Sequence, residues 1–143
     1  MFKQLEGLAV WAPVILRVFL GLLFFIHGSQ KMFGAWGGAG VVGTAAFFEK
    51  FGIFPGLFWA WVVTIVEFFG GVFLIFGLLT RIAAGLLVID MLVAVIKVHW
   101  PVFIWLNRGY EFPLTLAVIA LTVFFWGPGT ASIDKATGIE KSS

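Results

Sequence analysis

The stretch Glu67–Arg81, EFFGGVFLIFGLLTR, decides the fold of this chain. A carboxylate at Glu67 stands in an otherwise apolar run, two glycines follow at Gly70 and Gly71, and a third, Gly77, comes near its end. An ionisable side chain inside a membrane segment is costly and marks a candidate functional site. The stretch therefore predicts a membrane-spanning helix that carries such a residue.

Composition extends this interpretation to the whole chain. Of its 143 residues, 62% are hydrophobic and 11% are charged, whereas soluble domains carry about 25% charged residues. The chain has no cysteine, which excludes disulfides, thiolate zinc sites and Cys-ligated iron–sulfur clusters. A net charge of +2 without a basic block argues against nucleic acid as a partner. We expect one integral membrane domain over residues 1–143 and no metal centre.

Four apolar runs are long enough to cross a hydrocarbon core of about 30 Å, which takes about 20 helical residues. Backbone groups in lipid must be hydrogen-bonded within the segment, so we expect every span to be helical. The first run follows Lys3 but is too long for the apolar part of a signal peptide, so we interpret it as an uncleaved span. The predicted fold class is all-α, a bundle of four transmembrane helices with spans near 10–33, 57–79, 82–100 and 111–127.

A short helix is predicted between the first two spans. Phe47, Phe48 and Phe51 fall on one side of it, and Glu49 and Lys50 fall on the other. That pattern is typical of an interfacial helix that lies on the bilayer or caps a bundle. The glycine-rich segment before it lacks the Gly-Lys-Ser/Thr of a phosphate loop, which argues against nucleotide binding.

The connections between the spans predict which helices are neighbours and on which side of the membrane the termini lie. Only a residue or two around Thr80–Arg81 separates the second and third spans, so these two should form an antiparallel hairpin. Four crossings put both termini on one side, and the tail from Ser132 is expected to be polar and exposed. Lysines and arginines near the span ends are balanced, and Arg17 tips the count toward cytoplasmic termini. We expect a bacterial-type cytoplasmic (inner) membrane location.

A stripe of small or polar residues lies on each of the four predicted helices, because positions spaced by 3 or 4 share a helix face. Glycines on a stripe allow neighbouring helices to approach closely, as Gly70 and Gly71 do beside Glu67. We expect all stripes to face a common bundle interior. They comprise Arg17, Gly21, Phe24, Gly28 and Lys31 on helix one, Glu67, Gly70 and Gly71 on helix two, Asp90, Ala94 and Lys97 on helix three, and Glu111, Thr115, Val118 and Thr122 on helix four.

Depth along the helices predicts which charges meet. Counting the helical rise from the ends places Arg17 and Asp90 at one level, with Glu67 somewhat deeper. We therefore expect Arg17 to bridge the two carboxylates with its forked guanidinium. These three are the candidate catalytic residues. A second group near the opposite surface is expected to contain His27, Lys97 and Glu111, with Lys31 and His99 at its edge.

Two interpretations of these charges stay open. They form ion pairs that only set helix register, or they form a proton-linked or quinone-headgroup site. Lys97, His99 and Arg108 also fit side chains that extend from a helix end to the membrane surface. His27 and His99 are the minimum for haem ligation from two helices, but their depths differ by several residues, so haem is not expected.

Several segments in the right order resemble the DoxX/DoxD family of small membrane proteins. They are RVFLGLLFFIHGSQKMFG (Arg17–Gly34), FGIFPG (Phe51–Gly56), EFFGGVFLIFGLLTRIAA (Glu67–Ala84), YEFPLTL, and GPGTASID (Gly127–Asp134). The resemblance implies a four-helix membrane bundle. Relatives include the quinone-reducing membrane subunit of thiosulfate:quinone oxidoreductase, which implies a membrane oxidoreductase or redox partner. By motif it assigns site positions to Arg17, His27, Lys31, Glu67, Arg81 and Glu111.

Three functions are compatible with these features. The first is a redox-complex membrane subunit that binds a quinone and receives electrons from a partner protein or bound cofactor. The second is a non-catalytic membrane anchor or scaffold for a partner enzyme. The third, a transporter, is disfavoured by the length of the chain unless it forms a homo-oligomer. Whether the chain is itself an enzyme stays open. Besides the candidate catalytic residues, the candidate cofactor-binding residues are His27, Lys31, Lys97 and Glu111.

Overall fold

The computed structural model describes residues 2–141 and is built of helices. A 3₁₀ turn at Ala9–Trp11 joins the first two helices into one long rod, and a π-helical turn at Val95–His99 extends the fifth. The α-helices are α1 Phe2–Leu8, α2 Ala12–Phe33, α3 Gly40–Lys50, α4 Gly56–Phe76, α5 Thr80–Ala94, α6 Glu111–Trp126 and α7 Ile133–Thr137. The predicted all-α class is confirmed.

Within residues 2–141, three helices are long and apolar enough to cross a membrane: Phe2–Phe33, Gly56–Phe76 and Thr80–His99. They correspond to the first three predicted spans. Helix α6 is apolar but has only 16 residues, which gives a length of about 24 Å. The fourth crossing therefore stays a prediction.

Glycines bring α2 and α4 together as antiparallel neighbours. A methyl group at Gly28 would overlap the backbone of Phe68, and one at Gly71 would overlap the backbone of Phe25. These two helices make the most extensive contact in the molecule, and α5 packs chiefly on α6. The predicted role of the glycines in close helix approach is confirmed.

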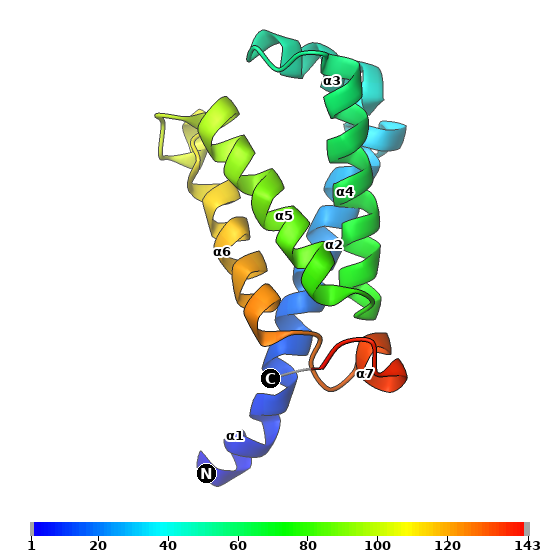
Figure 1. Cartoon of the computed structure of the whole chain (residues 1–143). Helices are drawn as coiled ribbons and strands as arrows, with labels where there is room; N and C mark the ends of the chain where they lie inside the picture. Colours follow the sequence, from blue (N-terminus) through cyan, green and yellow to red (C-terminus); the bar gives the residue numbers. More distant parts are fainter. Residues whose placement is uncertain (1, 142–143) are drawn as a thin grey trace.

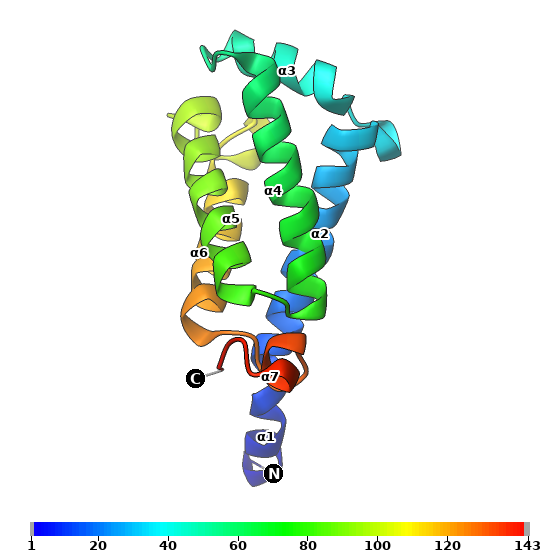
Figure 2. The same cartoon turned by 45° about the vertical axis from the view of Figure 1, so that its right-hand side comes forward.

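The two helix pairs diverge along the molecule. In Figure 1 they meet near the end that carries α7 and spread apart toward the end that carries α3. Below, these are called the tail end and the α3 end. The predicted short helix is present as α3, which lies across the end of α4 in both views (Figures 1 and 2) and packs on it through Ala45, Phe48 and Ala60. Its position at the bilayer surface stays a prediction.

The turn between α4 and α5 spans only residues 77–79, so the predicted hairpin is confirmed. The tail from Ser132 is predicted to be exposed, which is confirmed for most of its residues but is wrong for Asp134. Asp134 on α7 is fully buried, and its backbone N–H donates to Gly77 O. The orphan N–H groups at the start of α5 need an acceptor, and the side-chain carboxylate of Asp134 accepts from two of them.

Candidate functional site

A cavity of about 1110 Å³ occupies the space where the helix pairs diverge. Helices α2, α3, α4, α5 and α6 all contribute to its walls, and the loop 100–110 closes part of the α3 end. Most of its lining is aromatic or aliphatic, with few polar groups, as is usual for a small-molecule site. The aromatic side chains are Phe24, Phe47, Phe48, Phe51, Phe54, Trp59, Trp100, Trp105 and Phe112.

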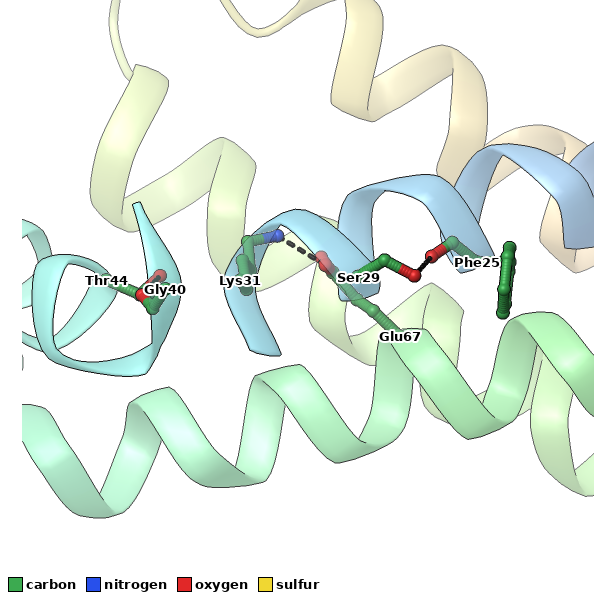
Figure 3. Close-up of polar contacts among 6 residues, drawn as sticks. All are labelled: Phe25, Ser29, Lys31, Gly40, Thr44 and Glu67. Carbon is green, nitrogen blue, oxygen red and sulfur yellow. Dashed lines mark hydrogen bonds and ion pairs between the residues drawn. The ribbon is translucent and has the colours of Figure 1, made fainter. Parts of the chain in front are cut away.

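Charged side chains gather where α2, α4 and α5 line this cavity. Lys31 of α2 forms an ion pair with Glu67 of α4, drawn in Figure 3. Asp90 of α5 interacts directly with the carboxyl of Glu67, and His27 lies one turn before Lys31 within electrostatic reach of the pair. We call these four residues the Glu67 cluster.

Glycine packing explains why Lys31 reaches Glu67. Gly28 packs on the backbone of Phe68, and this contact fixes how α2 is positioned along α4 next to Glu67. Lys31 lies one helical turn beyond Gly28 and on the same face. Glu67 is only 2% exposed, whereas 26% of the Lys31 side chain is exposed. The cation therefore reaches inward from a wetter position to a buried acid.

Charge balance in the Glu67 cluster favours a bound proton. Lys31 supplies one positive charge opposite the two carboxyls of Glu67 and Asp90. Leaving a net charge buried is costly, so the cluster is neutral when one carboxyl is protonated and His27 is neutral. Asp90 Oδ2 is buried and has no hydrogen-bond partner among the described residues. The cluster can therefore accept, hold and donate a proton at the cavity wall.

The predicted cluster of Arg17 with Asp90 and Glu67 was wrong. Arg17 is buried at the tail end, where its Nη2 donates to Ala131 O at 2.6 Å. A residue at Gly77 larger than glycine would overlap its guanidinium. Helix α1 begins at Phe2 and projects beyond the bundle (Figure 1), and the Arg17 guanidinium lies beside Gly77 and Ala131, so Arg17 is nearer the tail end than expected. About ten helical positions along α4, or about 15 Å, separate its level from Glu67.

The predicted group of His27, Lys97 and Glu111 forms only in part. His27 and Lys97 line the cavity with Lys31, but Glu111 faces a second hollow beside Phe103 and Thr115. Its Oε1 accepts a hydrogen bond from the backbone N–H of Trp105 at 2.9 Å. Glu111 thus holds the loop 100–110 and does not reach the cluster.

The polar stripe on α6 faces outward, contrary to the prediction. Thr115, Val118 and Thr122 are exposed. Each threonine hydroxyl donates to a carbonyl one turn earlier in its own helix, at 2.7 Å and 2.9 Å. This local bond satisfies the hydroxyl without a partner helix. The buried face instead carries Pro113, Leu116, Ala117, Ala120 and Val123.

The stripe on α5 does face the cavity, since Asp90, Ala94 and Lys97 all line it. Two further contacts were not predicted from the sequence. Lys31 was placed at the edge of a different group rather than paired with Glu67, and Asp134 was left in an exposed tail. Packing Gly28 against Phe68 and Gly71 against Phe25 gives the register that places Lys31 beside Glu67.

Together these features define an all-helical integral membrane protein whose helices enclose an aromatic cavity with a charged cluster. The chain belongs to the DoxX family, which it matches over residues 12–100. It is 34% identical over 110 residues to a Bacillus subtilis (strain 168) protein named "Putative oxidoreductase CatD", covering 77% of this chain and 76% of that protein. It is 31% identical over 140 residues to an uncharacterized protein of Haemophilus influenzae, covering 92% of this chain and 95% of that one. No solved structure matches the chain.

Proposed function

We propose that this protein is the membrane subunit of a quinone-linked oxidoreductase complex and that the quinone binds in the aromatic cavity. The observation that carries the proposal is the position of the Glu67 cluster on the wall of that cavity. A flat ring packs well between aromatic side chains, while its oxygens require hydrogen-bond donors and a source of protons. The relative named as an oxidoreductase supports the same class of function.

The cluster offers the polar chemistry that quinone reduction needs. Reduction takes up two electrons and two protons, one proton for each ring oxygen. The Lys31 ammonium and the His27 ring are donors, and the Asp90–Glu67 pair holds a transferable proton. Electrons come from a partner protein or from a cofactor that the partner carries. We place the complex in a cytoplasmic (inner) membrane with cytoplasmic termini.

Tryptophans in the cavity wall make binding measurable. Trp59, Trp100 and Trp105 line the cavity, so a short-chain ubiquinone titrated into the purified protein should quench tryptophan fluorescence. Glu67→Gln should weaken binding about tenfold or more, because a charged partner in a hydrogen bond contributes about 1.5–3 kcal/mol. The matched control is Glu6→Gln, which alters a carboxylate on exposed α1, away from this cavity, and should bind like the wild type.

Mass spectrometry of the protein after gentle detergent extraction gives an independent readout. We expect a lipid quinone to be retained by the wild type. A folded wild type that retains no quinone and gives no saturable quenching would instead indicate a non-catalytic anchor for a partner enzyme. That alternative finds some support in α1, which projects beyond the bundle with exposed Phe2, Leu5 and Leu8 (Figure 2).

A further inference from the structure

His99 is the last residue of the π-helical turn Val95–His99 that extends α5. In a continuous α-helix, a residue nine positions after Asp90 would point about 180° away from it. The π-helical turn at Val95–His99 takes more residues per turn and so reduces that rotation. His99 consequently lines the same cavity as Asp90. Such turns are frequent at functional sites.

The hydrogen bond of His99 fixes its tautomer. Its Nδ1 lies 2.6 Å from the backbone oxygen of Arg108. A carbonyl oxygen can only accept, so Nδ1 carries the proton. The Nε2 of the neutral ring is then a lone pair that can accept a further proton. The Nε2 of His99 is therefore a proton acceptor held in place by the backbone.

The carboxyl pair of the Glu67 cluster needs such a group because its own atoms have little contact with water. Glu67 is 2% exposed, and Asp90 Oδ2 is buried. Nine residues of helical rise, about 13 Å, separate Asp90 from His99. The cavity that joins them has room for several water molecules at about 30 Å³ each. A proton can cross this distance along water but not by direct transfer.

We infer that His99 is the proton-entry residue of the cavity and reloads the Asp90–Glu67 pair. Its Nε2 takes a proton from the aqueous side of the α3 end and passes it through cavity water to the carboxyl pair. The inference rests on the proposed function, because quinone reduction is the reaction that consumes the protons. Each two-electron reduction consumes two protons at the quinone oxygens, and two passages through His99 replace them. The charged side chains that line this end with His99 are Lys97, from the same helix, and Arg108, from the loop.

Infrared spectroscopy can follow this step without any electron donor. The C=O absorption of a protonated carboxyl, assigned by its loss in Asp90→Asn and Glu67→Gln, reports proton occupancy of the pair. After a rapid drop from an alkaline pH at which the pair has lost its proton, His99→Gln should slow the rise of this band about tenfold or more, as expected for loss of a general acid–base group. Glutamine keeps a side-chain N–H for the Arg108 carbonyl, so the loop should remain folded.

A second variant separates proton transfer from structure. His99→Ala should also slow the rise, and imidazole added to the buffer should restore it toward the wild-type rate. Glu6→Gln, on exposed α1 and outside the cavity, should keep the wild-type rate. Reprotonation of His99→Gln at the wild-type rate would overturn the inference, as would absence of the band from the wild type. This readout uses no quinone, so a failure of ubiquinone binding would refute the proposed function separately.

Discussion

Asp134 caps the start of α5 by hydrogen-bonding Thr80, which lies 54 positions earlier in the chain. Its Oδ2 accepts from the backbone N–H of Thr80 at 2.9 Å and from the Thr80 hydroxyl at 2.7 Å, while Oδ1 accepts from Leu79 N at 2.8 Å. Both Asp134 and Thr80 are fully buried. A carboxylate at a helix N-terminus also interacts favourably with the helix dipole. The tail is therefore part of the folded bundle.

Replacement of this cap should destabilise the protein. Asp134→Ala leaves two buried N–H groups and a buried hydroxyl without their acceptor, which should lower the free energy of unfolding by about 2 kcal/mol or more. Denaturation of the purified protein in mixed detergent micelles measures the change. Lys135→Ala, at the exposed neighbouring position, is the matched control and should change stability little. Equal stability of the two variants would contradict the capping role.

Gly77 and Gly138 form a matched pair of left-handed glycines, with φ of 66° and 73°. Alanine at either position should cost about 1 kcal/mol for its backbone conformation. Gly77→Ala should cost distinctly more, because its methyl group would overlap the buried Arg17 guanidinium, whereas Gly138 has open space around it. Thermal unfolding of both variants tests this, and equal melting temperatures would show that Arg17 can move away freely.

The Lys31–Glu67 ion pair should show coupling in a double-mutant cycle. Lys31→Met removes the cation from a carboxylate that is 2% exposed, and an unpaired buried charge is strongly unfavourable. Because Lys31 is itself partly exposed, we expect a coupling energy of about 1–3 kcal/mol. Lys31→Met combined with Glu67→Gln should therefore be more stable than the sum of the single variants predicts. Strict additivity would mean that the two side chains do not interact in the membrane.

Helix contact between α2 and α4 should be sensitive to a single methyl group. Gly28→Ala would place that group against the backbone of Phe68, which cannot rotate away as a side chain can. We expect a loss of about 2 kcal/mol, together with weaker ubiquinone binding because Lys31 would shift from Glu67. Gly7→Ala, in the exposed part of the same rod, meets no neighbouring atom and should be neutral or slightly stabilising. Unfolding and fluorescence titrations of both variants give the comparison.

The sequence predicted the helical elements well because they depend on local properties. Long apolar runs must satisfy their backbone hydrogen bonds internally, and this requirement alone places helices over most of the predicted spans. The short connection after Gly77 forces α4 and α5 into a hairpin. Glycines at Gly28 and Gly71 likewise predicted close helix contact, since small side chains permit it wherever a partner helix lies.

Contacts between helices depend on how each helix is positioned along its neighbour. Counting the helical rise from the span ends does not give that position. The first helix starts outside the bundle, so counting from its beginning placed Arg17 too deep and paired it with the wrong acids. Polarity alone also misplaced the α6 stripe, because Thr115 and Thr122 bond to their own helix and need no interior partner.

By itself, then, the sequence determined that this protein is a helical membrane protein and that Glu67 and Asp90 lie within it. Only the tertiary structure decided that Lys31, rather than Arg17, meets Glu67, and that the tail carrying Asp134 returns to cap α5. The physical reason is the range of the interactions. Hydropathy and backbone hydrogen bonding act within one segment, whereas an ion pair depends on how two helices slide and rotate against each other. Glycine contacts across α2 and α4 set that position.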